Sequence, residues 1–482
     1  MIGNLSALTP IIVLGVTPLV LMLLIACCRS HLLTAVLSLV GLALALVLLP
    51  GTALHESHTV TPLLVMDGYA LFYIGLLAAG TFVVVVLSYG YMERQSGHRE
   101  EFYLLLTLAT FGCAVLAASN HFASFFLGLE ILSVSLYGLV AYLRESDRGL
   151  EAGIKYLILA AASAAFLLFG MALVFADLGT LDFSAMAALL PKKTSDPGLL
   201  LLGGFAMIVI GIGFKLALVP FHMWAPDVYQ GAPTPITAYL TTVSKGAMLA
   251  LVLRYAQLGG LFQYDSVSSV VAVIAVASMF IGNLLALLQD NLKRLFAYSS
   301  IAHLGYLLVA ALASSKVGTE AVMYYLVAYF VTSLGIFGII TVLSDARKDA
   351  DDINDYRGLF WRRPVVSGAL TLMLFSLAGI PFTAGFIGKF YVLLAGVDSQ
   401  LWTLVVLLAL SSVIGVYYYL RLIIVMYVST EQRDANGILP ATRRLSLPEG
   451  LVIAGLTFLV VWFGINPATL VGTIQAAVQS MT

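Results

Sequence analysis

The chain has 482 residues, of which 61% are hydrophobic and only 10% are charged, and its formal net charge is −1. One soluble core of this length could not bury so much apolar surface, so the composition indicates a polytopic membrane protein. The near-zero charge and the lack of a long basic run argue against nucleic-acid binding. The three cysteines have no metal-ligand spacing, which argues against a disulfide framework and against a zinc or iron–sulfur site.

Apolar stretches of about 20 residues, the length that spans the hydrocarbon layer, recur along the whole chain. The first is predicted to be a retained helix, because no basic segment precedes it and no small-residue cleavage site follows it. Fourteen membrane helices are predicted, at residues 8–28, 31–50, 67–91, 102–118, 120–142, 151–177, 199–225, 231–256, 266–288, 294–313, 318–343, 364–394, 401–428 and 448–474. The predicted fold class is therefore an all-α integral membrane protein.

Basic residues are distributed unequally between the two sets of loops. Fifteen follow odd-numbered helices: Arg29, Arg94, Arg99, Arg144, Arg148, Lys293, Arg294, Arg347, Lys348, Arg357, Arg362, Arg363, Arg433, Arg443 and Arg444. Four follow even-numbered helices: Lys192, Lys193, Arg254 and Lys316. Because Lys and Arg are retained in cytoplasmic loops, both termini are predicted to lie outside the cytoplasm.

Two short motifs recur in the two halves of the chain. The pattern E-A-x-x-x-Y-L begins the helices at Glu151–Leu157 and Glu320–Leu326, which are five helices apart, and Val219–Phe221 is echoed by Ile380–Phe382. An odd separation places the copies in opposite orientations, as in the inverted repeats of transporters, although such short apolar matches also arise by chance. The predicted units are residues 1–98 (helices 1–3), 99–260 (first repeat, helices 4–8), 261–430 (second repeat, helices 9–13) and 431–482 (helix 14).

Prolines lie inside two helices that correspond in the proposed repeats. Pro220 lies in helix 7, and Pro381 lies in helix 12 beside Gly379 and Gly385. Proline removes a backbone hydrogen bond, and an opened membrane helix is tolerated where the freed groups face protein or a water-filled cavity. Helices 7 and 12 are therefore predicted to be discontinuous, and the matching breaks indicate the functional site.

Four ionisable residues lie deep inside apolar stretches: Glu130, Lys215, Lys245 and Lys389. A charge at bilayer depth costs roughly 3 kcal/mol or more, so each is a candidate functional group. Burial favours a neutral lysine and a nearby carboxylate restores the charge, so Glu130 and Lys215 together suggest a proton switch. Lys245 would relay the proton and Lys389 would release it. The alternatives are a protonated structural carboxylate, packing lysines and, for Lys389, a side chain that extends to the membrane surface.

Other polar residues are weaker candidates. His303 suits a shuttle between the two lysine regions, because an imidazole changes charge near neutral pH, but it could equally be a packing histidine. His222 lies near the break in helix 7. Glu151 and Lys155 are spaced as an i,i+4 ion pair, which could tune Lys215 or simply lie at the membrane surface. Five aspartates between residues 345 and 355 are predicted to form a solvated loop.

Several runs carry a specific resemblance. They are NHFASFFLGLEILSVSLYGLVAY (120–142), PDVYQGAPTP (226–235), KRLFAYSSIAHLGY (293–306) and LAGIPFTAGFIGKFY (377–391). These runs resemble the antiporter-like membrane subunits of the respiratory NADH:quinone oxidoreductase, complex I, and the resemblance covers nearly the whole chain. Lysine at position 389 and the lack of a long helix after helix 14 favour the subunit N family over its sister families.

The resemblance implies that Glu130, Lys215, Lys245 and Lys389 carry protons from the cytoplasm to the periplasm across a bacterial inner membrane. It implies a translocase subunit without redox chemistry of its own, because NADH, FMN, iron–sulfur clusters and quinone are bound by other subunits. It also implies subunits M, K and J and the lipid bilayer as partners. Two alternatives stay open: a subunit of a Mrp-type or self-standing cation/proton antiporter, and a structural scaffold with vestigial charges.

Overall fold

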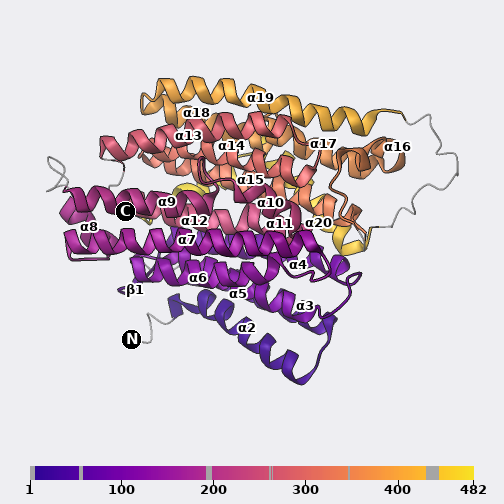
Figure 1. The fold of residues 1–482 in the computed structure, drawn as a ribbon, viewed down its shortest axis with the longest axis horizontal. Helices are drawn as coiled ribbons and strands as arrows, with labels where there is room; N and C mark the ends of the chain where they lie inside the picture. Colours follow the sequence, from indigo (N-terminus) through magenta and orange to yellow (C-terminus); the bar gives the residue numbers. More distant parts are fainter. Residues whose placement is uncertain are drawn as a thin grey trace.

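The protein is a bundle of roughly parallel and antiparallel helices that starts with α2 on one side and reaches α19 on the opposite side (Figure 1). This computed structural model describes residues 6–53, 58–190, 198–259, 262, 264–345, 348–429 and 445–481. The first third contains α2 (Thr9–Cys27), α3 (His31–Ala53), the antiparallel strands β1 (His58–Thr61) and β2 (Leu64–Met66), α4 (Gly68–Met92), α5 (Glu100–Ala118), α6 (Phe122–Val140) and α7 (Asp147–Leu178).

The middle of the chain contains α8 (Phe183–Leu189), α9 (Leu199–Leu216), α10 (Trp224–Gly231), α11 (Thr234–Tyr239), the π-helical segment η2 (Leu240–Ser244), α12 (Lys245–Gly259), α13 (Asp265–Leu287), α14 (Leu292–Leu312) and α15 (Lys316–Leu343). The last part contains the 3-10 turn η4 (Ile353–Tyr356), α16 (Leu359–Arg362), α17 (Pro364–Ala378), α18 (Ala384–Asp398), α19 (Trp402–Tyr427), α20 (Leu447–Ile465) and α21 (Ala468–Gln479).

The predicted helix count is confirmed. In the described residues 13 helical segments are long and apolar enough to span a membrane, and the broken pair α17–α18 supplies the fourteenth predicted span. One boundary is wrong: the predicted helix at 448–474 is divided at Asn466 and Pro467 into α20 and α21, because proline cannot continue the first helix. The short β1–β2 hairpin was not predicted.

The two halves pack in the same way. Helix α5 packs against α6 as α13 packs against α14, and α7 packs against α9 and α10 as α15 packs against α17 and α18. Glycines allow the closest crossings. A Cβ on Gly112 would lie 2.8 Å from the Gly128 carbonyl oxygen, and one on Gly282 would lie 2.8 Å from the Tyr298 carbonyl oxygen. Small residues of this kind let membrane helices approach closely, so the α5–α6 pair and the α13–α14 pair both pack through a glycine.

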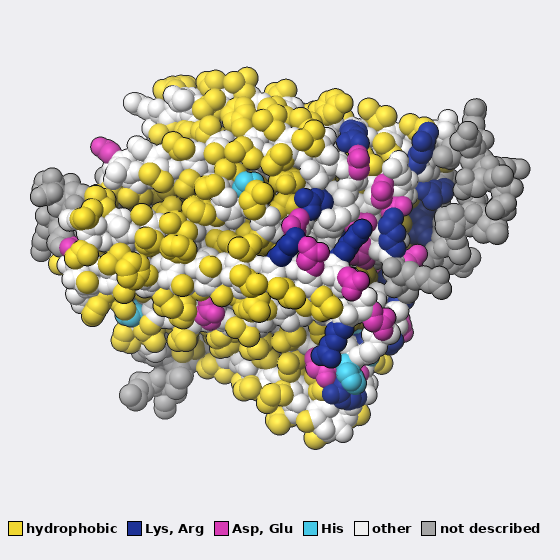
Figure 2. Space-filling view, viewed as in Figure 1, with side chains coloured by type: hydrophobic (Ala, Val, Ile, Leu, Met, Phe, Trp, Pro, Cys, Tyr) yellow, Lys and Arg dark blue, Asp and Glu magenta, His cyan; other side chains and the backbone are white. Residues whose placement is uncertain are grey.

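The outer surface fits a lipid environment. Large apolar side chains are exposed on the outer helices, such as Leu23 on α2, Phe169 on α7 and Val413 on α19. In Figure 2 hydrophobic side chains cover most of the visible face, whereas Lys and Arg gather with Asp and Glu at one end. This arrangement is typical of a protein that exposes its apolar side to lipid and one charged end to water.

Both predicted helix breaks are present. Helix α9 ends at Leu216 and is followed by Ala217 in the left-handed conformation (φ 56°), and α17 ends at Ala378 and is followed by Gly379 (φ 84°). Side chains satisfy part of the freed backbone at the first break. The indole of Trp224 donates to the Phe214 carbonyl (2.9 Å), and the Val219 amide donates to the Ser278 hydroxyl (3.0 Å). Such compensation is what makes a break tolerable at membrane depth.

Helix 8 of the prediction contains an irregularity that the sequence did not reveal. The π-helical segment η2 separates α11 from α12 and ends immediately before Lys245. The hydroxyls of Thr241 and Thr242 donate to the carbonyls four residues earlier, at 2.7 Å each. Hydroxyls that compete in this way for helix carbonyls bend helices, and π segments often occur at functional sites.

A buried ion pair joins the N-terminal helices to α12, and it corrects one prediction. Arg254 was counted with the loop residues at the end of the predicted helix 231–256, but it lies well inside α12 and its side chain is only 1% exposed. Its guanidinium donates two hydrogen bonds to Asp67, at 2.7 and 2.8 Å, and Asp67 also caps the first turn of α4. Six other residues of the loop count lie outside the described residues: Lys192, Lys193, Arg347, Arg433, Arg443 and Arg444.

The aspartate-rich loop is also not simply solvated. Asp349 is mostly buried: it pairs with the buried ammonium of Lys293 and accepts a hydrogen bond from Tyr91 (3.0 Å), while Asp351 accepts one from Asn291 (2.6 Å). Burial raises the pKa of Asp349, but Lys293 outweighs that effect, and the net pKa lies below the ordinary value of an aspartate. This loop is therefore fastened to the start of α14.

Removing either partner of the Arg254–Asp67 pair should destabilise the protein strongly. Asp67→Ala leaves a buried, uncompensated guanidinium, which typically costs about 3–5 kcal/mol. The midpoint temperature of thermal unfolding of the detergent-solubilised protein measures this. Asp290→Ala is the control, because Asp290 is the exposed partner of Arg421 and such a pair contributes about 1 kcal/mol or less. Equal midpoints for the two variants would contradict the assignment.

The Asp349 pair should make part of the stability dependent on pH. Because the folded pKa of Asp349 is lowered, its contribution is complete above the unfolded-state pKa of about 4 and disappears as the pH falls through the folded value. The difference in thermal midpoint between the native protein and Asp349→Asn should therefore be constant near neutral pH and shrink below about pH 4. The exposed Asp398→Asn serves as control, and a pH-independent difference for Asp349→Asn would refute the pairing.

Candidate functional site

Three lysines are buried at membrane depth, and each lies at an irregularity of a helix. Lys215, Lys245 and Lys389 are 9%, 2% and 9% exposed. Lys215 is in the last turn of α9, Lys245 follows η2 directly, and Lys389 lies in α18 just after the second break. Carbonyl groups at the C-terminal end of a helix carry partial negative charge and favour a cation, which applies to Lys215 in the last turn of α9 and to Lys389, whose ammonium contacts the last carbonyl of α17. Lys215 and Lys389 lie next to the two predicted helix breaks, whereas the irregularity before Lys245 was not predicted.

Lys215 donates to the hydroxyl of Ser133 on α6 (2.7 Å), and its ammonium lies over the ring of Tyr156 at 5.7 Å. Glu130 lies one turn before Ser133 on the same helix, and its Oε1 is buried without a hydrogen-bond partner in the described part of the chain. The predicted neighbourhood of Glu130 and Lys215 is therefore present. The serine, and not the carboxylate, makes the direct contact.

Lys245 donates to the hydroxyl of Ser300 on α14 (2.5 Å) and lies over the ring of Tyr229 at 5.4 Å. Rings connect it to the first lysine: Tyr156 lies 5.0 Å from Trp224, and Trp224 lies 6.4 Å from Tyr229, between ring centroids. Lys215 and Lys245 are therefore linked by a series of contacting rings, Tyr156, Trp224 and Tyr229, which we call the aromatic series.

Lys389 donates to the hydroxyl of Ser412 on α19 (2.8 Å) and to the carbonyl of Ala378 (2.9 Å), the last residue of α17. It lies over the ring of Tyr306 at 5.5 Å. The alternative of a lysine that extends to the membrane surface is wrong, because the ammonium is buried and caps the broken half-helix. Lys389 and Lys215 are not equivalent in the repeat, since Lys215 precedes its break and Lys389 follows its own.

His303 on α14 joins helices of the second repeat. Its two ring nitrogens lie 2.5 Å from the hydroxyl of Tyr325 on α15 and 2.9 Å from that of Tyr419 on α19. Tyr419 contacts Ser299 (2.5 Å) and, at 3.3 Å, the hydroxyl of Tyr418. His303 is thus the centre of a hydrogen-bonded cluster, which fits both a shuttle and a packing role.

The cluster extends to Asn283 on α13. Tyr418 donates to Asn283 Oδ1 (2.8 Å), and the two hydrogens of Nδ2 have three acceptors within reach: the carbonyls of Met279 and Ser411 (3.0 Å each) and the hydroxyl of Tyr306 (2.8 Å). Two of these partners are carbonyls, which only accept hydrogen bonds, so the assignment of nitrogen and oxygen follows from the chemistry. A side-chain amide connects the Tyr418 and Tyr306 hydroxyls.

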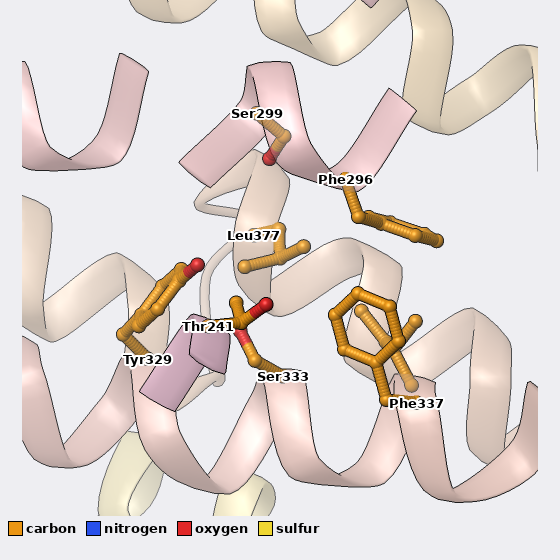
Figure 3. Close-up of a pocket in the computed structure, with 8 residues that line it drawn as sticks. Thr241, Phe296, Ser299, Tyr329, Ser333, Phe337 and Leu377 are labelled. Carbon is orange, nitrogen blue, oxygen red and sulfur yellow. The ribbon is translucent and has the colours of Figure 1, made fainter. Parts of the chain in front are cut away.

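Two small adjacent cavities, which share Tyr329 and Leu377 in their linings, lie between η2, the segment before Lys245, and the break before α18, the helix that carries Lys389. The first is lined by Thr241, Phe296, Ser299, Tyr329, Ser333, Ile336, Phe337 and Leu377. The second is lined by His303, Tyr325, Ala328, Tyr329, Thr332, Ser376, Leu377 and Gly385. Figure 3 shows the first, with hydroxyl groups on one side and Phe296 and Phe337 on the other. The first is too narrow to admit water, and the second has room for about one molecule.

The secondary candidates differ in outcome. The predicted Glu151–Lys155 ion pair is confirmed at 2.6 Å, and Lys155 also pairs with Asp227 on α10 (2.9 Å). Asp227 in turn binds Arg294 (2.6 Å), so this network joins α7, α10 and α14. It does not contact Lys215. His222 lies in the break after α9, and its ring nitrogens have no hydrogen-bond partner among the described residues.

One group of the described residues has the geometry to hold a metal ion, and its environment argues against one. His98, Glu100 and Glu101 bring ligand atoms together. The guanidinium of Arg29 already contacts His98 (2.6 Å) and Glu101 (2.9 Å). A cation would have to displace this positive group.

Sequence reasoning missed the direct partners of the lysines, namely Ser133, Ser300, Ser412, Tyr156, Tyr229 and Tyr306. One signal was present in the sequence: each serine belongs to a close pair in an apolar helix, with Ser135, Ser299 and Ser411. Distance along the chain hid the pairing, since 55 and 82 residues separate two of the lysines from their serines.

Comparisons with known proteins agree with this geometry. Residues 119–415 match the family described as NADH:quinone oxidoreductase/Mrp antiporter, transmembrane. A relative from Nitrosospira multiformis, NADH-quinone oxidoreductase subunit N, is 50% identical over 99% of this chain and 97% of its own length.

Two solved structures share the fold. A chain of respiratory complex I from Thermus thermophilus with bound aureothin has 30% identity and a TM-score of 0.80, over 97% of this chain and 100% of its own. A chain of the Mrp complex from Dietzia sp. has 19% identity and a TM-score of 0.87, over 99% of this chain and 97% of its own. The second likeness concerns the fold alone. The chain therefore belongs to the NADH:quinone oxidoreductase/Mrp antiporter membrane family, and within that family it groups with subunit N of NADH:quinone oxidoreductase.

Proposed function

We propose that this chain is a proton-translocating membrane-arm subunit of an NADH:quinone oxidoreductase. The observation that carries the proposal is a series of ionisable side chains, Lys215, Lys245, His303 and Lys389, buried across both repeats and joined by hydroxyls and cavities. Ionisable groups buried in this way in a membrane bundle mark proton relays. The kinship to subunit N supports the same function.

The first part of the path runs from Lys215 to Lys245. Glu130 supplies a carboxylate close to Lys215, and its unpartnered oxygen can favour the charged lysine from a short distance. The hydroxyl of Ser133 and the ring of Tyr156, the first member of the aromatic series, hold the ammonium of Lys215 inside the protein. We infer that the proton is taken up at Lys215 and passes to Lys245.

The second part runs from Lys245 to His303 through the first cavity. Ser300 holds Lys245, and its neighbour Ser299 lines the cavity together with Thr241 and Tyr329. Because this cavity does not admit water, a proton cannot cross it by a water chain in this conformation. Widening of this dry segment is therefore the step that we propose is controlled by the rest of the complex.

The last part runs from His303 to Lys389 through the second cavity. Ser376 and Gly385 line that cavity at the break before α18, where Lys389 caps Ala378. The other branch, from Tyr419 to Tyr418, ends at Asn283. A neutral amide cannot accept a proton on one side and release another without an unfavourable tautomer, so this branch does not conduct.

The charged end of the molecule supports the orientation. Positive residues are retained in the cytoplasm, so we propose that the end with clustered Lys and Arg in Figure 2 faces the cytoplasm and that both termini face the periplasm of a bacterial inner membrane. Moving one charge against 100 mV costs about 2.3 kcal/mol, so outward transfer needs energy from quinone reduction in other subunits. Subunits M, K and J are the proposed neighbours, and further subunits of the complex would hold the redox cofactors.

A Mrp-type antiporter is the second candidate, because the Mrp complex has the same fold. The 50% identity to a subunit N favours the first function. Purification of the tagged chain in mild detergent separates the two: NADH- and quinone-binding subunits support the first, and a set of small membrane subunits alone supports the second.

Lys215→Ala in the intact complex should lower proton pumping at least tenfold, because the buried acceptor at the start of the path is lost. Glu130→Ala should lower it in the same direction but less, since the carboxylate makes no direct contact. Lys348→Ala is the control, because this side chain is 62% exposed in a surface pair. Pumping is measured as acidification of inside-out vesicles during NADH oxidation. A native rate of proton pumping in the Lys215→Ala variant would contradict the pump hypothesis.

His303→Leu and Tyr418→Phe test which branch conducts. The first removes the ionisable group that lines the second cavity and should lower pumping about as much as the loss of Lys389. The second removes only the hydroxyl that donates to Asn283, and pumping should stay within twofold of the native rate. The reverse pattern in the same vesicles would show that the proton leaves through Asn283.

A further inference from the structure

The three buried lysines share one local arrangement, although they lie on three different helices. Each ammonium donates to a serine hydroxyl of another helix: Lys215 to Ser133, Lys245 to Ser300 and Lys389 to Ser412, at 2.5–2.8 Å. Each also lies 5.4–5.7 Å from the centroid of a tyrosine ring. In the described residues no carboxylate lies within ion-pair distance of any of these ammonium groups.

A hydroxyl differs from a carboxylate in one respect that matters for a proton carrier. A hydroxyl oxygen accepts a hydrogen bond from an ammonium group, and after rotation its hydrogen is donated to a neutral amine. A carboxylate only accepts, so it holds the charged lysine and gives the neutral lysine no donor. A buried group left without a partner costs about 1–3 kcal/mol. A serine avoids this penalty in both protonation states.

We propose that Ser133, Ser300 and Ser412 are positioning residues that keep a hydrogen bond to their lysine in both the charged and the neutral state. They thereby allow each lysine to gain and lose a proton without leaving a buried polar atom unpaired. This inference rests on the proposed function, because it assumes that the lysines change protonation during turnover.

Ser133 shows how the exchange would work. Its hydroxyl accepts from Lys215 and lies 2.5 Å from the carbonyl of Leu129, to which it donates its hydrogen while the lysine is charged. When the lysine is neutral, rotation about one bond turns that hydrogen to the amine nitrogen. Ser135, two residues later, also donates to the carbonyl four residues earlier (2.7 Å) and is equally buried, but it makes no hydrogen bond to a lysine in the described part of the chain. It is a matched control on the same helix.

The test is the pH profile of NADH-driven proton pumping by the intact complex in vesicles. In Ser133→Ala the charged lysine loses its acceptor, so Lys215 releases its proton at lower pH. The alkaline limb should therefore move to lower pH by about one unit, the size expected for the difference between a charge-assisted hydrogen bond and the weaker neutral one that is lost with it. Ser133→Thr keeps the hydroxyl and should restore the native profile. Ser135→Ala should match the native profile.

A Ser133→Ala profile that coincides with the Ser135→Ala profile would overturn the proposal. If the alanine variant does not assemble, Ser133→Cys decides, because a thiol is a weaker donor and acceptor and should give a smaller shift in the same direction. Lys215→Ala separates the two hypotheses. If that variant pumps normally, the proposed function fails; if it does not pump while the Ser133 variants keep the native profile, only the serine role fails.

Discussion

The burial of ionisable lysines in an apolar bundle is the constraint on which this structure depends. Each such group costs roughly 3 kcal/mol or more at bilayer depth, so it persists only where the protein supplies polar partners. Here the partners are serine hydroxyls on neighbouring helices and, for Lys389, a carbonyl freed at a helix break. Lys215 lies in the last turn of α9, Lys245 follows a π-helical segment, and Lys389 donates to the carbonyl of Ala378 at the end of α17. Helix breaks that would weaken a soluble protein become the sites that hold charge.

The arrangement also explains why two repeats are needed. Each half contributes one broken helix, and the described cavities lie where α14, α15 and α17 of the second half meet η2 of the first. A serine, a tyrosine ring and a lysine recur at three points along this line. In the proposed path the first cavity has no room for water and forms a closed segment between Lys245 and His303. A pump requires such a closed segment, because a continuous proton-conducting path would let protons flow back across the membrane.

Much of this was readable in the sequence, because membrane spans, prolines and isolated charges are local signals. The number of helices, the breaks near Pro220 and Pro381 and the lysines beside them were all predicted. What failed depended on contacts between distant segments. Arg254 was counted with the loop residues because its partner Asp67 is 187 residues away, and the aspartates after α15 were expected in solvent because the buried Lys293 could not be foreseen. The π-helical segment η2 contains no proline, so no local signal in the sequence indicated it.

The central claim is that one line of buried groups carries the proton through both repeats. The most direct measurement is the number of protons pumped per NADH oxidised by an intact complex that carries Lys245→Met, an apolar replacement of similar length in the middle of the line. The account predicts a lower ratio, with NADH oxidation either slowed or uncoupled from this subunit. A ratio and a rate equal to those of the native complex would contradict it.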